Sequence, residues 1–240
     1  MAKRPKTLVL LSGGLDSSTL AYFVAREMGH EVECLSIYYG QRHRRELAAA
    51  EAIAKSLGAR FDVVDISSVG SLLETSALTN PDVAVPEGHY AAENMAITVV
   101  PNRNMTFLSI AAAIAASRGY YRIAAAVHSG DHYIYPDCRP EFVNSFRETV
   151  QLALGVSEFL VYTPFLLKTK ADIVSVGSRL GVPFELTWSC YKGGEKHCGR
   201  CGTCVERAEA FYLAGVPDPT EYEDPDYWGT VSKHKGGVAS

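Results

Sequence analysis

No stretch of this 240-residue sequence approaches the roughly 20 consecutive apolar residues that a transmembrane helix needs. The apolar run that follows the basic N-terminus, Leu8–Leu11, is also too short for the core of a signal peptide. Both absences argue against insertion into a membrane or transport across one. We therefore expect a cytoplasmic protein without a membrane partner.

The sequence also lacks an excess of positive charge. It contains 23 Lys and Arg residues against 27 Asp and Glu residues, which gives a formal net charge of −4. Broad, charge-driven binding to nucleic acid needs a basic surface that releases counterions. Direct contact with nucleic acid is therefore not expected, and small molecules are the expected partners.

Cysteine is scarce, with six residues in the chain. In a reducing compartment these residues are expected to be thiols, metal ligands or reactive groups rather than structural disulfides. The chain is long enough to bury most of its apolar surface without cross-links. Its 47% apolar and 21% charged residues are typical of a globular protein.

What the sequence does contain is an alternation of short apolar runs with helical patterns, which is typical of a parallel sheet covered on both faces. The predicted strands are Thr7–Leu11, Val32–Tyr38, Phe61–Asp65, Arg122–Val127 and Phe159–Thr163. The predicted helices between them are Ser17–Met28, Arg44–Leu57, Thr106–Arg118, Glu141–Leu154 and Lys170–Leu180. The last four of these helices are closed by Gly58, Gly119, Gly155 and Gly181, and Gly at this position is a C-terminal stop signal. The pattern predicts an α/β fold with a doubly wound, mainly parallel five-stranded sheet.

Two regions depart from this alternation. Residues 67–100 contain scattered Pro, Gly and Asn and predict a long irregular excursion, of the kind that often serves a site. After Pro183 the chain is rich in Cys and Gly, and then a helix is predicted at Thr203–Ala214. We predict a main domain at 1–185, a small metal-binding C-terminal region at 186–230 and a mobile tail at 231–240.

The residues Ser12–Ser18 form a loop between the first strand and the first helix. Gly13 and Gly14 allow close backbone approach, the serines add hydroxyl donors, and the helix N-terminus attracts an anion. Asp16 suits either a helix cap or a Mg²⁺ ligand, and a plain tight turn is the alternative explanation of the whole loop. The lysine of the P-loop is absent, which disfavours transfer of the terminal phosphate. The loop resembles that of the N-type ATP pyrophosphatases, which transfer AMP.

Four cysteines, Cys190, Cys198, Cys201 and Cys204, follow the spacing C-x7-C-x2-C-x2-C. Four thiolates at this spacing predict one structural Zn²⁺ per chain, because closed four-cysteine sites are typical of that metal. An iron–sulfur cluster and plain reduced thiols are the alternatives. We do not expect His197 to be a ligand, because a residue adjacent to a ligand rarely points the same way.

Three polar clusters, Tyr38–His43, Val100–Asn104 and Tyr135–Phe142, follow or interrupt apolar elements. Each alone could be a helix cap or a turn. Together with the loop and the cysteine spacing they resemble the 7-cyano-7-deazaguanine synthase family, from about Thr7 to Ala214. That family commonly has Gln in place of Leu15 and often Gly in place of Asn102.

The resemblance implies an adenine nucleotide alpha hydrolase-like fold, a homodimer, and the conversion of 7-carboxy-7-deazaguanine with ammonium and ATP into a nitrile. A carboxylate is a poor acyl donor, so the carboxylate and then the amide would each be adenylated. The last stretch of the chain, after Ala214, lies outside the resemblance.

The resemblance also implies roles for individual residues. The residues implied in ATP binding are Leu11, Ser12, Gly13, Gly14, Leu15, Asp16, Ser17, Ser18, Thr19, Leu20, Ala21, Ser36 and Tyr38. The catalytic residues implied are Asp16 with Mg²⁺, Lys170 and Arg103, with Lys168 as a further cation. The residues implied for the deazaguanine are Gln41, Arg42, Asp131, Tyr135, Asp137 and Arg139. His128 could act as a base toward ammonium, but a lone His at a strand end is more often a hydrogen-bonded neighbour.

Two other functions are consistent with parts of the sequence. A tRNA-thiolating pyrophosphatase shares the loop but needs a basic face and a persulfide-bearing thiol. A zinc-dependent nucleic-acid-binding module accounts for the cysteines but leaves the loop at Ser12 unexplained.

Overall fold

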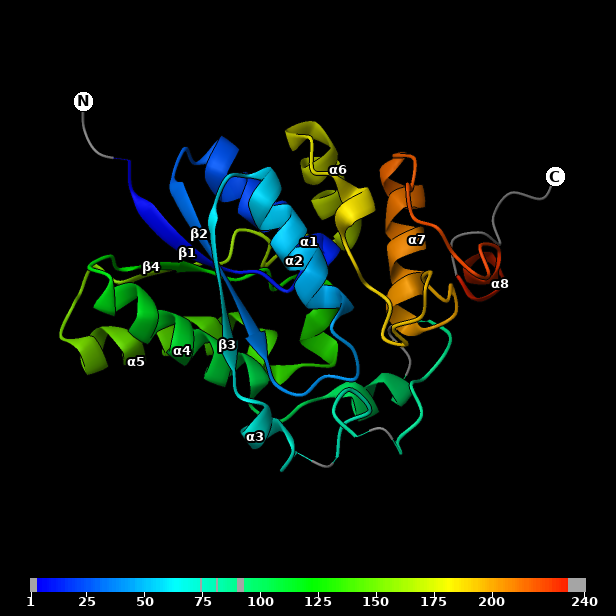
Figure 1. The fold of residues 1–240 in the computed structure, drawn as a ribbon, viewed down its shortest axis with the longest axis horizontal. Coiled ribbons are helices and arrows are strands. Elements are labelled where there is room, and N and C mark those ends of the chain that lie inside the picture. Colours follow the sequence, from blue (N-terminus) through cyan, green and yellow to red (C-terminus); the bar gives the residue numbers. More distant parts are fainter. Residues whose placement is uncertain (1–3, 74, 81, 90–92, 233–240) are drawn as a thin grey trace.

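The computed structural model describes residues 4–73, 75–80, 82–89 and 93–232. At its centre is a five-stranded sheet in the order β3-β2-β1-β4-β5, in which every neighbouring pair is parallel (Figure 1). The strands are β1 Lys6–Leu10, β2 Glu31–Tyr38, β3 Arg60–Asp65, β4 Arg122–Ala124 and β5 Leu160–Tyr162. This confirms the predicted doubly wound fold with its five strands.

The helices alternate with the strands as predicted. They are α1 Leu15–Tyr22, α2 Arg45–Ser56, α3 Ser67–Gly70, α4 Arg103–Ser117, α5 Pro140–Leu154, α6 Lys170–Leu180, α7 Gly202–Ala214 and α8 Tyr227–Val231. A π-helical turn, Phe23–Glu27, continues α1. The glycines predicted to end helices, at positions 58, 119, 155 and 181, all have positive φ angles, which L side chains rarely adopt.

Helices cover both faces of the sheet because successive strand residues point to opposite sides. Val9 and Cys34, which pair across β1 and β2, face α1, α2 and α6. Leu8 and Ile123, which pair across β1 and β4, face α4 and α5 instead. Figure 1 shows α1 and α2 on one side of the sheet and α4 and α5 on the other. One hydrophobic core therefore packs on each face of the sheet.

Two boundaries differ from the sequence prediction by three residues. The β4 strand ends at Ala124 rather than Val127. Helix α4 begins at Arg103 rather than Thr106, because Asn102 adopts a left-handed conformation with φ of 58°. The Asp137 carboxylate then accepts a hydrogen bond from the Asn104 backbone N–H at 2.8 Å and caps the new first turn. Asn and Gly are the residues that adopt this left-handed conformation most readily.

The excursion at 67–100 is irregular as predicted, and within its described residues the helical elements are α3 and a 3₁₀ turn at Glu93–Thr98. It reaches the C-terminal region through a bridge between Glu87 and Cys201. There α7 packs against α6, and α8 packs against α7 (Figure 1). Most of the tail predicted to be mobile, residues 233–240, lies outside the described residues.

Strand order places the site. From β1 the chain proceeds to β2 and β3 on one side and to β4 and β5 on the other. A crevice therefore opens beyond the carboxyl ends of β1 and β4, where open α/β sheets bind their ligands. Across the described part of the chain, no helix is long and apolar enough to span a bilayer.

Candidate active site

A cavity of about 270 Å³ occupies this crevice. Its floor is the loop Ser12–Ser17 after β1, and its walls include the end of β2 and the segment after β4. Side chains from α2, α4, α6 and α7 complete the lining. The cavity thus lies at the position that the strand order predicts.

The loop turns directly into helix α1. Gly14 is its N-cap, and the Gly14 N–H donates to Ser12 Oγ at 3.3 Å. The hydroxyls of Ser12 and Ser17 lie 3.0 Å apart, and Ser17 Oγ also accepts from the Ser12 N–H at 3.2 Å. The first N–H groups of an α-helix have no partner within the helix. Together with the two hydroxyls they make an anion site.

Gly13 has a packing role that the sequence did not indicate. It has a φ of 84°, and a Cβ atom placed there would lie 2.3 Å from the Glu46 carbonyl oxygen and 2.6 Å from the Ala50 nitrogen. Both atoms belong to the backbone of α2 and cannot swing away. Gly13 therefore lets the loop lie directly on α2, and it does not itself line the cavity.

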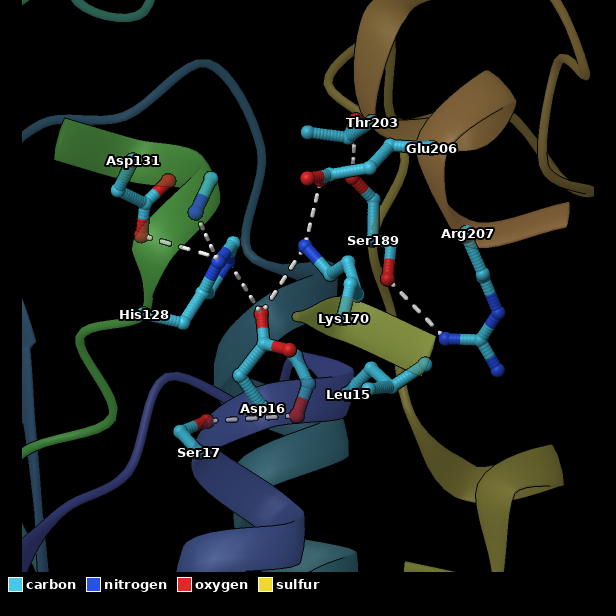
Figure 2. Close-up of polar contacts among 12 residues, drawn as sticks. Leu15, Asp16, Ser17, His128, Asp131, Lys170, Ser189, Thr203, Glu206 and Arg207 are labelled. Carbon is cyan, nitrogen blue, oxygen red and sulfur yellow. Dashed lines mark hydrogen bonds and ion pairs between the residues drawn. The ribbon is translucent and has the colours of Figure 1, made fainter. Parts of the chain in front are cut away.

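One group of charged side chains surrounds Lys170 at the start of α6 (Figure 2). Its Nζ lies 3.1 Å from Asp16 Oδ2 and 2.6 Å from Glu206 Oε2 on α7. Burial opposes the charge on Lys170, but these carboxylates raise its pKa above the ordinary value. Burial likewise opposes ionisation of Asp16, yet Lys170 and His128 hold the pKa of Asp16 below its ordinary value. The ion pair is therefore charged at neutral pH.

Asp16 also keeps one oxygen available. Its Oδ1 is buried and has no hydrogen-bond partner among the described residues. A carboxylate oxygen beside a phosphate site is the donor that Mg²⁺ prefers. The site therefore fits the divalent cation that the sequence predicts for Asp16.

His128 is held in one tautomer. Its Nδ1 accepts a hydrogen bond from the Gly130 N–H at 3.1 Å, so the proton of a neutral ring is on Nε2. That Nε2 faces Asp131 Oδ2 at 3.4 Å and Asp16 Oδ2 at 3.8 Å (Figure 2). Both ring nitrogens are thus engaged. The arrangement suits a donor that orients the two carboxylates, rather than the base predicted from the sequence.

A second polar group lies on the side of the cavity formed by α2 and α4. Glu46 lines it beside Arg103, whose guanidinium lies 5.5 Å from the centre of the Tyr135 ring. Burial raises the pKa of Glu46 to about 7, and Arg103 opposes this only in part. No described residue donates a hydrogen bond to the Glu46 carboxylate. Tyr39 and Tyr191 line the same part of the cavity.

The four predicted cysteines form one buried cluster. One ligand atom from each lies within 4.8 Å of all the others. Backbone N–H groups point at two of the sulfurs, and such donors stabilise thiolates. They come from Lys192 and Cys198 to Cys190 Sγ, both at 3.4 Å, and from Arg200 at 3.4 Å and Cys201 at 3.3 Å to Cys198 Sγ. The cluster can therefore bind a metal ion.

His197 is engaged elsewhere, as expected. Its Nε2 accepts from the Ser189 N–H at 3.1 Å, and its ring stacks on Trp188 with centroids 4.3 Å apart.

Comparison with known proteins agrees with this geometry. The model of the family described as queuosine biosynthesis protein QueC matches residues 6–215. The chain belongs to the QueC family. This confirms the resemblance carried by the loop, the polar clusters and the cysteine spacing, and it assigns the chain to queuosine biosynthesis.

Curated relatives of this QueC chain match it over nearly its whole length. It is 56% identical over 228 residues to the 7-cyano-7-deazaguanine synthase of Rhizobium rhizogenes, covering 95% of this chain and 96% of the relative. It is 57% identical over 225 residues to the enzyme of that name from Sinorhizobium fredii, covering 93% and 94%. Among solved structures, NMN synthetase from Francisella tularensis aligns with a TM-score of 0.47 and 15% identity, covering 100% of this chain and 89% of that one.

The fold brings most of the predicted site residues of this QueC chain to one cavity. Those that line it are Leu11, Ser12, Gly14, Leu15, Asp16, Ser17, Ser36, Gln41, Arg42, Arg103, Asp131, Tyr135 and Lys170. The lining does not include Gly13, Ser18, Thr19, Leu20, Ala21, Tyr38, Asp137 or Arg139.

The residues outside the cavity have other contacts. Leu20 and Ala21 belong to the core between α1 and the sheet. The Tyr38 ring lies 4.6 Å from the Arg44 guanidinium. Asp137 caps α4, and Arg139 Nε donates to the His132 carbonyl at 2.9 Å. Asp137 and Arg139 therefore hold the segment that carries Tyr135 in place.

Sequence reasoning missed several residues that shape the site. Glu46 on α2 looks like an ordinary polar residue of an amphipathic helix. Glu206 follows Cys204 by two positions, and nothing in the sequence predicts its contact with Lys170. That contact depends on α7 beginning beside the cavity. Trp188 and Tyr191 flank the first cysteine and line the cavity from the C-terminal region. Only the folded cysteine cluster explains why Trp188 and Tyr191 line the same cavity as the loop Ser12–Ser17.

Proposed function

We propose that this chain is a 7-cyano-7-deazaguanine synthase, a ligase that forms C–N bonds at the expense of ATP. One observation carries the proposal. A lysine-free phosphate loop at a helix N-terminus shares a single cavity with the Asp16–Lys170 pair. That combination suits transfer of AMP to a carboxylate, because it stabilises departing pyrophosphate.

In the first half of the reaction the carboxylate of 7-carboxy-7-deazaguanine attacks the α-phosphorus of ATP. Pyrophosphate leaves and an acyl-adenylate forms. Ammonia then adds to the acyl carbon, AMP departs with the former carboxylate oxygen, and one proton is released. The product is the amide.

In the second half the amide oxygen attacks the α-phosphorus of a second ATP, and pyrophosphate leaves again. Loss of the remaining N–H protons and cleavage of the C–O bond release AMP and the nitrile. Both halves are adenylations of an oxygen on the same carbon. One phosphate loop therefore serves both.

Different residues around the loop would bind different parts of ATP. The N–H groups at the start of α1 and the hydroxyls of Ser12 and Ser17 would hold the phosphates. Lys170 would stabilise the charge that develops on pyrophosphate. Asp16 Oδ1 would hold Mg²⁺, which supplies further charge neutralisation. The backbone of β2 at Ser36 would meet the adenine. Ser18, Thr19, Leu20 and Ala21 belong to α1 and would hold the start of that helix in place by packing in the protein interior.

Glu46 is the carboxylate proposed to recognise the deazaguanine. A guanine-like edge presents two N–H donors, and a carboxylate that lacks a donor can accept both. Arg103 would compensate the charge of Glu46, and Gln41, Asp131 and Tyr135 line the space beside it. Replacing Glu46 with Gln should reduce discrimination against an analogue that lacks the 2-amino group.

The cysteine cluster is proposed to hold one structural Zn²⁺. Four converging thiols with no open position suit a closed tetrahedral site, which stabilises the fold without redox chemistry. The division into a main domain at 1–185 and a metal-binding region at 186–230 rests on this site. A homodimer and a cytoplasmic location are proposed from the family.

The nearest alternative, thiolation of tRNA, finds little support in the cysteines. It needs a reactive thiol, and the two cysteines outside the cluster are Cys34 and Cys138. Both are buried, and burial raises the pKa of both thiols, that of Cys34 to about 12. Thiols of this kind are poor nucleophiles at neutral pH.

Pyrophosphate release tests the proposal. The protein is incubated with ATP and Mg²⁺, either with ammonium and 7-carboxy-7-deazaguanine or with tRNA and a sulfur donor. We expect release only in the first mixture. Release only in the second would contradict the proposed function.

A further inference from the structure

The residue Trp188 contacts both the nucleotide loop and the cysteine cluster. Its backbone N–H donates to the Gly13 carbonyl oxygen at 2.9 Å. Its indole Nε1–H donates to the Cys190 carbonyl oxygen at 2.8 Å. One residue therefore contacts both sites, the loop through its backbone N–H and the first cysteine through its indole.

The Trp188 ring is fixed from several sides. It stacks on His197, and the Arg45 guanidinium of α2 lies 5.1 Å from its centre. The same residue lines the cavity. A displacement of Trp188 would therefore shift the loop at Gly13, because the packing around the ring leaves it few other positions.

A second connection runs through the start of α7. Cys201 is the N-cap of this helix, and Cys204 lies in its first turn. Between them, Thr203 Oγ1 donates to the Ser189 carbonyl oxygen at 2.8 Å (Figure 2). Glu206 then contacts Lys170 at 2.6 Å. The cysteine cluster thus fixes the point at which α7 begins, and with it the position of Glu206 beside Lys170.

We propose that metal binding at the four cysteines and nucleotide binding at the loop are thermodynamically linked, with Trp188 as the positioning residue between them. Bound metal holds Cys190 and α7 in place, so that Trp188 keeps its bond to Gly13. By reciprocity, a nucleotide that orders the loop must strengthen metal binding by the same factor. The linkage rests on the proposed function only in requiring that the loop binds ATP.

Metal transfer from the holoprotein to a chromogenic chelator measures the linkage. The rate is compared with and without saturating Mg²⁺ and α,β-methylene-ATP, which cannot be cleaved between its first two phosphates. We expect the nucleotide to slow metal release from the unmodified protein by about fivefold or more. Calorimetry with the same nucleotide shows independently that the loop is occupied.

The variant Trp188→Phe keeps an aromatic ring and the backbone N–H but lacks the indole N–H. We expect the nucleotide's protection to fall below about twofold in this variant while the metal remains bound at the start. The matched control is Trp228→Phe on α8, whose ring packs on Tyr212 at 5.2 Å. Its protection should equal that of the unmodified protein.

Equal protection in Trp188→Phe and in the unmodified protein would overturn the role of Trp188. Nucleotide binding without any protection would overturn the linkage alone, whereas absence of nucleotide binding would overturn the proposed function as well. Thr203→Val tests the second connection, through α7. It removes the contacts of the Thr203 hydroxyl with the Ser189 carbonyl and with Cys201 Sγ and keeps all four cysteines, and undiminished protection there would overturn the connection through α7.

Discussion

The Nζ atom of Lys170 lies 3.1 Å from Oδ2 of Asp16 and thereby joins the start of α6 to the start of α1. Because Lys170 also contacts Glu206, removing the Asp16 charge leaves Lys170 paired. We expect Asp16→Asn to lower the turnover number by about 100-fold or more, as loss of a group that stabilises transition-state charge does. The thermal midpoint should stay within about 3 °C.

The control for this variant is Asp226→Asn, at an exposed position before α8. It should leave both the turnover number and the midpoint unchanged. Near-normal ATP consumption by Asp16→Asn would contradict the role assigned to Asp16.

Gly13 provides a test of how the loop packs on α2. In Gly13→Ala the new Cβ would meet backbone atoms at 2.3 and 2.6 Å, so the loop or the helix must move. We expect a loss of about 2 kcal/mol or more in the free energy of unfolding, measured with urea. Gly29→Ala is the matched control, because Gly29 also has a positive φ but no atom within 4 Å of its Cβ position. It should lose only about 1 kcal/mol. Equal losses would show that the close approach is unimportant.

The sequence predicted the elements of the fold that depend on local patterns, but not the boundaries that depend on tertiary contacts. The strands, six of the helices and the four helix-ending glycines followed from apolar periodicity and local stop signals, which depend on neighbours in sequence. The boundary of α4 did not, because it depends on Asp137, a residue 33 positions from the Asn104 N–H that it caps. Tertiary contacts of this kind leave no local pattern.

The site shows the same division. The loop and the cysteines are contiguous motifs, and the residues near them in sequence were found. Glu46 and Trp188 line the cavity from other elements, Glu206 contacts Lys170 from α7, and each looks ordinary in its own segment. The resemblance implies Asp137 and Arg139 as substrate residues, whereas in the structure Asp137 accepts from the backbone and side-chain N–H groups of Asn104 and Arg139 donates to the His132 carbonyl.

Glu46 makes stability depend on pH. Its pKa is raised from 4.5 to about 7, so between these values the folded protein binds more protons than the unfolded chain. The free energy of unfolding therefore falls as pH rises through this window. Glu46→Gln has no buried carboxyl to ionise, so it avoids the loss of stability at high pH. It should be more stable than the unmodified protein by about 1–2 kcal/mol at pH 8, but not at pH 4.5.

Urea unfolding at the two pH values measures this difference. The matched control is Glu51→Gln, at an exposed position on the same helix. Its effect should be the same at both pH values. A Glu46→Gln effect that does not change with pH would contradict burial of the carboxylate.

The cysteine cluster is tested by removing one ligand. We expect Cys201→Ser to lower metal content and the thermal midpoint together, because a structural metal contributes its binding energy to folding. Elemental analysis and a thermal scan of the same sample measure both. Cys34→Ser removes a buried thiol outside the cluster and should leave metal content unchanged. Undiminished metal in Cys201→Ser would exclude Cys201 as a ligand.

The proposed reaction adenylates two oxygens of one substrate carbon in succession. Isotope labelling tests this with 7-carboxy-7-deazaguanine in which both carboxylate oxygens are ¹⁸O, followed by mass spectrometry of the products. We expect two AMP molecules for each nitrile, each carrying one ¹⁸O, and unlabelled pyrophosphate. Unlabelled AMP, with the ¹⁸O in pyrophosphate or water, would contradict the two adenylations.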